Sequence, residues 1–213
     1  MRFTFQVQRE DIMSDITEIT QLILRERQGR DRGWWAQMEE CYHSESVVSI
    51  SWLRSSGADF VARSKEIHSR GIRPVHRLSP PVVHINRDRA VVEVPTSISL
   101  RTLIHGVDAD LESSVRNLYQ VERHDSNWKI MFLTCIYERD MLTPAMPGTS
   151  LDLDIEQLAR FRKSYRCLAY HLSLEGHSVP DSLFGDDIPE PVDALYASAF
   201  DWMRTQVSRS DRL

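Results

Sequence analysis

Residues 115–138, VRNLYQVERHDSNWKIMFLTCIYE, contain the pattern that decides the fold. Apolar and polar side chains alternate on both sides of the polar stretch from His124 to Asn127, which is typical of two half-buried strands joined by a turn. One face of each strand is expected to carry Val115, Asn117, Tyr119 and Val121 on the first, and Trp128, Ile130, Phe132, Thr134 and Ile136 on the second. The stretch therefore predicts a β-hairpin.

Upstream of the hairpin, helices precede strands. Apolar periodicity predicts, in order, a helix over 11–29, a short helix over 34–42, a strand over 48–52, a helix over 58–69, and strands over 75–85 and 90–105. Pro95 cannot donate a ladder hydrogen bond, so it predicts a sheet edge or a bulge. Because a bulge shifts the alternation of side chains, the pattern leaves open which of Ser99, Leu100 and Arg101 face inward.

Downstream of the hairpin, residues 143–149 form a linker rich in Pro, Gly and Thr. Two amphipathic helices are expected beyond it, one over 155–172 and one over 189–203, which Pro189 and Pro191 open. Helices, then a meandering sheet, then a helical tail indicate an α+β fold.

The composition narrows the class of protein. The 213 residues are 41% hydrophobic and 27% charged, with a formal net charge of −5, as in ordinary globular proteins. No apolar run reaches the roughly 18 residues of a membrane span, and the N-terminal sequence does not resemble a secretory signal. Cys41, Cys135 and Cys167 are odd in number and widely spaced, which favours a reducing cytoplasm. The mild acidity argues against nucleic acid as a partner.

Common catalytic and binding motifs are missing from the sequence. It contains no phosphate-binding glycine loop, no GxSxG, no HExxH and no CxxC, so we expect no metal and no cofactor. Near the end of the first helix, Arg25, Arg27, Arg30 and Arg32 are interrupted by acidic residues. The simplest interpretation of these arginines is a solvated helix end.

Four segments in a fixed order resemble one family. They are LRERQGRDRGWW (24–35), CYHSESVVSISW (41–52), VHRLSPPVVHINRDRAVVEV (75–94) and NLYQVERHDSNWKIMFLTCIYERD (117–140). Together they resemble the SnoaL-like branch of the nuclear transport factor 2 superfamily, over about residues 8–145. The resemblance implies a cone-shaped, curved antiparallel sheet packed on N-terminal helices, a cystatin-like α+β barrel, with a C-terminal helical pair added here.

The resemblance also implies a site. Scytalone dehydratase, bile acid dehydratases, a dehydrochlorinase and polyketide cyclases of this superfamily use an Asp and a His inside the cone. At those positions this chain has Asp31 and His76. A neutral imidazole can accept a proton at neutral pH, and a carboxylate on its other nitrogen orients it. The implied substrate-binding residues are Arg101, Tyr119, Trp52, Trp35, Ser99 and Arg139.

The resemblance favours an enzyme: a cofactor-independent lyase, isomerase or cyclase acting on a small hydrophobic cyclic or polyketide-like molecule. The alternative is a non-catalytic ligand-binding or subunit-assembly protein of the same fold. The plainer interpretation of Trp35, Trp52 and Tyr119 is that they are core aromatics. Because such cones usually pair through the exposed sheet face, a homodimer is expected.

The length leaves a surplus beyond one cone domain. We divide the chain into a cone domain over 1–145 and a linker with a helical extension over 146–213. The extension is too short to form its own core. It is therefore predicted to pack on the cone as a lid over its mouth, or on a partner subunit as an arm.

Overall fold

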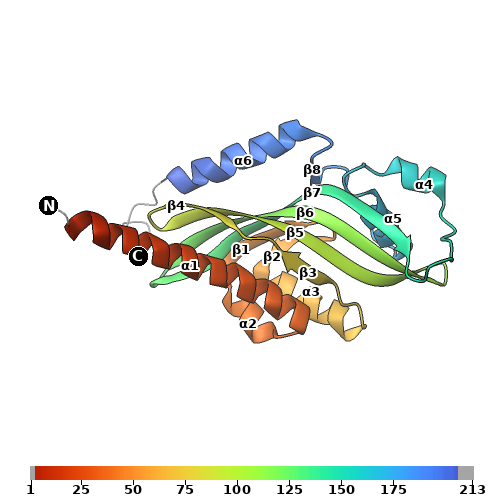
Figure 1. Cartoon of the computed structure of the whole chain (residues 1–213), viewed down its shortest axis with the longest axis horizontal. Coiled ribbons are helices and arrows are strands. Elements are labelled where there is room, and N and C mark those ends of the chain that lie inside the picture. The colour runs from red at the N-terminus through yellow and green to blue at the C-terminus, as the bar shows by residue number, and fades with distance from the viewer. Residues whose placement is uncertain (1–2, 206–213) are drawn as a thin grey trace.

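The hairpin is longer than the alternation predicts. The computed structural model describes residues 3–205 (Figure 1), and residues 1–2 and 206–213, at the outer ends of the two predicted regions, lie outside it. Strands β6 (Val107–His124) and β7 (Asn127–Pro144) are joined by Asp125 and Ser126, both with positive φ. This backbone matches the twist of a tight two-residue hairpin turn.

Two register shifts along β7 change which side chains share a face. Val121 pairs with Ile130 but Gln120 pairs with Phe132, so one extra residue sits in β7, and a second shift lies at Ser114 and Val115. The extra residue reverses the alternation. The prediction that Phe132, Thr134 and Ile136 share a face with Trp128 and Ile130 is therefore wrong: Leu133, Cys135 and Tyr137 turn inward instead and are buried.

Pro95 lies inside a regular strand. Strand β5 (Arg89–Ile104) pairs with β6 without a register shift, so the predicted bulge is absent between these two strands. On its other side β5 pairs first with β4 (Val82–Asn86) and then with β3 (Val75–Leu78), and Ser79 donates to the Pro95 carbonyl at 2.9 Å. The missing N–H of Pro95 thus faces the break between β3 and β4, where no ladder bond is lost.

The remaining strands complete one curved sheet. Strand β1 (Tyr42–Ile50) pairs antiparallel with β2 (Leu53–Ser56) and parallel with β7. Within the described residues the order is β2-β1-β7-β6-β5-β3, with β4 beside β5 and the short β8 (Phe184–Gly185) beside β7. The predicted α+β class, with a curved and largely antiparallel sheet, is confirmed.

Three N-terminal helices cover one face of this sheet. Helix α1 (Phe3–Arg32) begins earlier than predicted and is followed by α2 (Trp35–Glu40) and α3 (Gly57–Ser69). Their apolar side chains form a core with alternate residues of β5 and β6: Ile19, Ile23, Met38 and Phe60 from the helices, and Val92, Val94, Tyr119 and Val121 from the strands. Burial of this apolar area drives the packing.

Between the sheet and residue 205, the chain forms three helices rather than two. The predicted helix over 155–172 is split into α4 (Ile155–Arg160) and α5 (Arg166–Leu174). Between them, Arg162 and Ser164 both bond Asp187, with the Arg162 Nη2–Asp187 Oδ1 distance at 2.6 Å and Ser164 Oγ–Asp187 Oδ1 at 2.8 Å. These tertiary bonds keep residues 161–165 from forming a helix. The spacing of apolar residues alone does not reveal this break.

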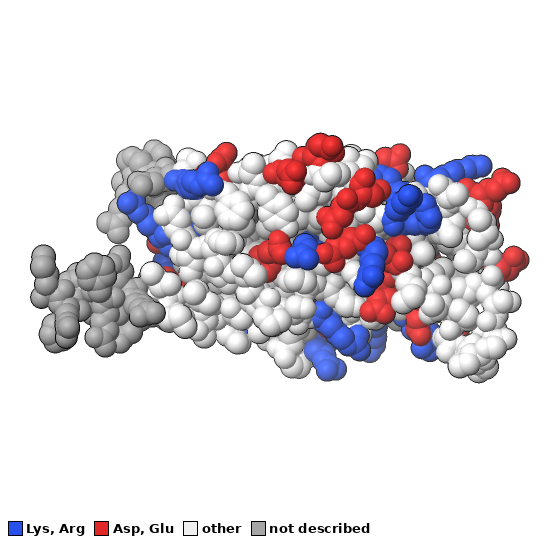
Figure 2. Space-filling view, turned by 45° about the horizontal axis from the view of Figure 1, so that its top comes forward, with Lys and Arg blue, Asp and Glu red and all other residues white. Residues whose placement is uncertain are grey.

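Helix α6 (Pro189–Arg204) matches the second predicted helix and covers the other face of the sheet (Figure 1). Its Val192 and Ala199 pack on Val91, Leu118 and Ile136, which alternate with the residues that face α1. On the same side, Arg116 bonds both Glu93 and Glu138, and acidic and basic side chains lie next to one another across the surface in Figure 2. None of the described helices is long and apolar enough to cross a membrane.

We expect the docking of α6 to keep this sheet face from associating with other molecules. Ala199→Asp places a charge at a position that is 1% exposed, so it should release α6 and expose the apolar strand residues beneath it. Self-association by sedimentation and binding of a hydrophobic dye should both increase. Ala197→Asp, on the exposed side of the same helix, is the matched control and should behave as wild type.

Candidate active site

A cavity of about 290 Å³ lies between the sheet and the helices. Its wall on the sheet is formed by inward side chains of β5, β6 and β7, including Ile98, Ser113, Asn117, Leu133 and Tyr137. The facing walls come from the end of α1, from α3 and from the turn after β1: Arg27, Arg30, Phe60, Ile67, Ser51 and Trp52. The cavity is thus mostly apolar, with a few polar groups that converge on it, as small-molecule sites usually are.

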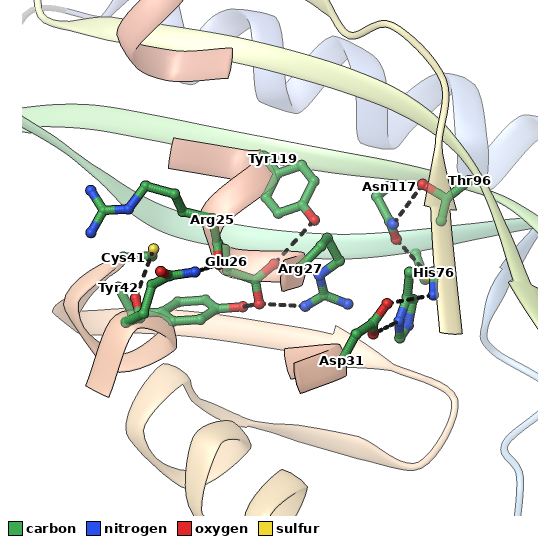
Figure 3. A network of polar contacts seen from close by, with 12 residues as sticks. Arg25, Glu26, Arg27, Asp31, Cys41, Tyr42, His76, Thr96, Asn117 and Tyr119 are labelled. Atoms are coloured by element: carbon green, nitrogen blue, oxygen red, sulfur yellow. Dashed lines mark hydrogen bonds and ion pairs between the residues drawn. The ribbon is translucent and has the colours of Figure 1, made fainter. Parts of the chain in front are cut away.

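Asp31 and His76 meet at one side of this cavity (Figure 3). Asp31 stands in the last turn of α1, and His76 is the second residue of β3, so the contact of α1 with β3 brings them together. The His76 Nδ1–Asp31 Oδ1 distance is 2.6 Å, and the backbone N–H of His76 donates to Asp31 Oδ2 at 2.7 Å. The carboxylate therefore holds both the ring and the strand that carries it.

Burial controls the protonation of the pair. The His76 side chain is 7% exposed, and burial lowers its pKa below the ordinary value, while the nearby Arg27 and Arg30 add to the effect against the opposing bond to Asp31. Burial acts to raise the pKa of Asp31, but the hydrogen bonds from His76 outweigh it and keep that pKa below the ordinary range. Both shifts favour a neutral imidazole beside a carboxylate at neutral pH.

A buried ion pair lies next to this dyad on α1. Glu26 is fully buried and bonds the Arg27 guanidinium through both carboxylate oxygens, and it also accepts from the Tyr42 hydroxyl at 2.8 Å (Figure 3). The Tyr119 hydroxyl lies 3.5 Å from Glu26 Oε2. Arg27 thus faces the cavity with its charge compensated, and its guanidinium lies over the Phe60 ring at 5.6 Å.

The structure brings three of the eight predicted site residues to this place. His76 and Trp52 line the cavity and Asp31 bonds His76. Tyr119 is buried against Glu26, and Trp35 packs edge-on against His68 at 5.4 Å, so neither is among the cavity residues of the described chain. Both fit the core interpretation better than substrate binding.

The three other predicted residues lie away from the cavity. Because β5 runs without a bulge, its even-numbered side chains face inward, so Ser99 and Arg101 turn to the opposite side. Ser99 accepts from Arg77 at 3.2 Å, and Arg101 is 61% exposed in an ion pair with Asp110. Arg139 is exposed on β7. This placement does not suit a role in substrate binding.

Sequence reasoning missed the arginines of α1. Arg27 and Arg30 were expected at a solvated helix end, but both are buried and line the cavity. The available signal was their helical spacing with Glu26 and Asp31, which places all four residues on two adjoining strips of one helix. Ser113 and Asn117 also line the cavity. The alternation places Asn117 on the inward face of its strand, but it does not show that a cavity lies there.

The C-terminal extension also contributes to the cavity. Leu168, His171, Leu172 and Glu175 line it from α5 and the residue after it, and His177 follows. Glu175 lies 3.8 Å from Arg70 of the segment after α3, so an ion pair joins two residues that line the cavity from the extension and from the cone. The cavity is therefore formed jointly by the predicted cone and by the extension. Among the described residues no group of His, Cys, Asp or Glu side chains is arranged to hold a metal ion.

The protonation of His76 should be measurable as a loss of stability in mild acid. The unfolded chain binds a proton at this residue near pH 6.5, whereas the folded chain binds it only at lower pH. The stability that the folded chain gains by keeping His76 neutral is therefore complete above pH 6.5. This stability is lost as the pH falls through the lowered pKa of His76. Denaturation at pH 7.5, 6.5 and 5.5 should show a decline, which His76→Asn reduces; an identical decline in both proteins would contradict the assignment.

Comparisons with known proteins identify the family of this chain. The profile of the SnoaL-like domain family matches residues 11–134. An uncharacterised protein of Emericella nidulans is 30% identical over 189 residues, covering 82% of this chain and 79% of that protein. That match is longer than the predicted cone region, so it extends into the C-terminal part.

Two solved structures share the fold at low identity. A hexachlorocyclohexane dehydrochlorinase is 11% identical, with a TM-score of 0.58 over 68% of this chain and 99% of that one. A putative scytalone dehydratase from Novosphingobium aromaticivorans is 14% identical, with a TM-score of 0.52 over 68% and 97%. At these identities the likeness shows the fold alone. The profile match covers more than half of the chain, and the chain belongs to the SnoaL-like domain family.

Proposed function

We propose that this protein is a cofactor-independent lyase, isomerase or cyclase in which His76 removes a proton from carbon. The observation that carries the proposal is the bond of 2.6 Å between His76 Nδ1 and Asp31 Oδ1 at the wall of an apolar cavity. A carboxylate within hydrogen-bond distance of one ring nitrogen orients the imidazole, and the other nitrogen can then act as a general base. The dehydrochlorinase and the dehydratase of the same fold are named for eliminations, which fits this class of reaction.

Each group has one role in the proposed step. Because Asp31 engages Nδ1, Nε2 is the nitrogen that accepts the proton from a bound molecule. The electron pair of the broken C–H bond forms a new double bond, and the charge moves to a carbonyl oxygen or leaves with a β-substituent. Asp31 stabilises the imidazolium that results. Elimination, double-bond isomerisation and aldol-type ring closure all follow from this first step.

The substrate is proposed to be small, hydrophobic and cyclic or polyketide-like, because apolar side chains dominate the cavity wall. We propose incubating the protein in D₂O with a panel of cyclic ketones and β-hydroxyketones, and following deuterium uptake at carbon by mass spectrometry. Uptake that depends on the protein supports proton removal. Native mass spectrometry after exposure to a cell lysate, on wild type and His76→Ala, identifies a retained ligand in parallel.

The alternative is a non-catalytic protein that binds a ligand or assembles with a partner. This alternative is favoured if no panel compound exchanges and if wild type and His76→Ala retain the same ligand equally well.

Three further points stay predictions: the division into residues 1–145 and 146–213, the cytoplasmic location and the homodimer. For the extension we propose the lid version, because α5 lines the cavity. A dimer through the sheet face covered by α6 would require that helix to move.

A further inference from the structure

Arg27 and Arg30 line the cavity from the described part of α1, and of these two Arg30 forms no ion pair. It is 4% exposed, and its Nη1 atom is buried without a hydrogen-bond partner among residues 3–205. In the same part of the chain no carboxylate lies within ion-pair distance of it, whereas its neighbour Arg27 is held by Glu26. A buried guanidinium nitrogen without a hydrogen-bond partner destabilises the fold. Its presence at the wall of a cavity therefore indicates that an acceptor atom of a bound ligand pairs with it.

Arg30 also lies next to the dyad. It directly precedes Asp31 in the last turn of α1, and its charge adds to the burial that lowers the pKa of His76. Burial and the neighbouring Arg27 lower the pKa of Arg30 itself to about 10, so it stays charged at neutral pH. A donor that is cationic, buried and beside the base is placed where charge develops after proton removal.

A second buried polar atom faces the cavity on the sheet side. Ser113 Oγ has no hydrogen-bond partner among the described residues, and Ser113 lines the cavity from β6. His76 pairs with Ile98, and Ile98 pairs with Ser113, so the three stand in one row across β3, β5 and β6. Two strand spacings separate the ends of the row, or roughly 10 Å. The apolar Ile98 lies between them.

We propose that the cavity takes an elongated, mostly apolar molecule with an oxygen at each end, one becoming negatively charged at Arg30 and the other accepting from or donating to Ser113. This rests on the proposed function, since the first oxygen is the one conjugated to the carbon that His76 deprotonates. When the proton moves to His76 Nε2, the electron pair shifts to that oxygen, and Arg30 stabilises the oxyanion. Halogenated hydrocarbons, which lack both oxygens, are thereby poor candidates.

The Arg30 subsite is tested with 4-nitrophenol, whose phenolate has its own absorbance. Titration of the bound probe should give a pKa at least about one unit below that of the free probe, a tenfold preference for the anion. Arg30→Met should abolish the shift. Arg77→Met is the matched control, because Arg77 is the next residue after His76 but is exposed, and it should keep the shift. An unchanged shift in Arg30→Met, or an equal loss in Arg77→Met, overturns the proposal.

Stability separates a binding role of Arg30 from a structural one. Because the substitution removes a buried charge that forms no ion pair with the described residues, Arg30→Met should unfold at the same temperature as wild type or higher. A marked loss of stability would show that Arg30 supports the fold and would overturn the assignment. Arg30→Gln, which retains polar donors without the charge, gives a second folded variant, and it should also lose the preference for the phenolate.

The Ser113 subsite is tested with 4-hydroxybiphenyl and 4,4′-dihydroxybiphenyl, which differ only in the oxygen at the far end. The second hydroxyl should tighten binding to wild type by about two- to tenfold, the range of one neutral hydrogen bond. Ser113→Ala should remove that difference and leave the binding of 4-hydroxybiphenyl unchanged. An equal preference in both proteins overturns this half of the proposal.

The outcomes also separate this inference from the proposed function. Binding of the phenolate uses no proton transfer to carbon, so it should persist in His76→Asn. Phenolate binding that depends on Arg30, without any deuterium uptake in wild type, would leave the subsite standing and remove the catalytic proposal. Deuterium uptake that depends on His76 but not on Arg30 would support the catalytic proposal and overturn the Arg30 subsite.

Discussion

Replacing His76 with asparagine is expected to slow deuterium uptake by any compound that the wild-type protein exchanges at least about 100-fold, the lower range for loss of a general base. Asparagine is smaller than histidine, but its amide N–H group leaves Asp31 a hydrogen-bond donor. The fold should therefore persist, as circular dichroism and thermal unfolding can verify. His68→Asn is the control, since His68 packs on Trp35 and lies outside the described cavity wall.

Asp31→Asn tests the positioning role in the same assay. The asparagine amide can donate to Nδ1, which forces the proton of a neutral imidazole onto Nε2, the nitrogen that must accept. We expect a loss comparable to that of His76→Asn with little change in KM. If Asp31→Asn keeps wild-type kcat, the carboxylate does not orient the base.

Glu26→Gln is expected to cause a large loss of stability. Glu26 is fully buried and supplies both hydrogen-bond acceptors of Arg27, so the change leaves a buried guanidinium without its counter-charge. Breaking a buried pair in this way costs about 3–5 kcal/mol. Urea unfolding measures the free energy, and the double variant Glu26→Gln with Arg27→Met should recover most of the loss.

The control for Glu26 is an exposed ion pair between α1 and α2. Glu40→Gln removes the partner of Arg25, where both side chains are more than half exposed, and should change stability by less than about 1 kcal/mol. Equal losses from Glu26→Gln and Glu40→Gln would contradict the idea that burial gives the Glu26 pair its importance.

The hairpin could be predicted from sequence, but its inward residues could not. Alternation from Val115 to Val121 identified the buried face of β6, whereas one extra residue in β7 moved Leu133 and Tyr137 inward. A bulge is a local backbone feature whose position depends on the strand opposite, so a single strand does not reveal it. Likewise, the length of the break between α4 and α5 depends on bonds to Asp187, far along the chain.

The site was predicted in part. Asp31 and His76 came from the resemblance, and the structure joins them by a hydrogen bond. Ser99 and Arg101 depended on the facing of β5, which the strand's own sequence left open and the regular pairing with β6 decided. The helical spacing of Arg27 and Arg30 is visible in the sequence, but it does not show that the two side chains are buried. Burial of a charge depends on tertiary partners such as Glu26 or a ligand.

The central claim is that burial keeps His76 neutral at neutral pH, while Asp31 binds Nδ1 and leaves Nε2 free to accept a proton. Long-range ¹⁵N–¹H NMR correlations of the His76 ring, followed from pH 8 to pH 4, test it without a substrate. We predict the Nδ1–H tautomer at neutral pH and a midpoint below the ordinary 6.5. An Nε2–H tautomer at neutral pH, or an imidazolium that persists above pH 7, would contradict the account.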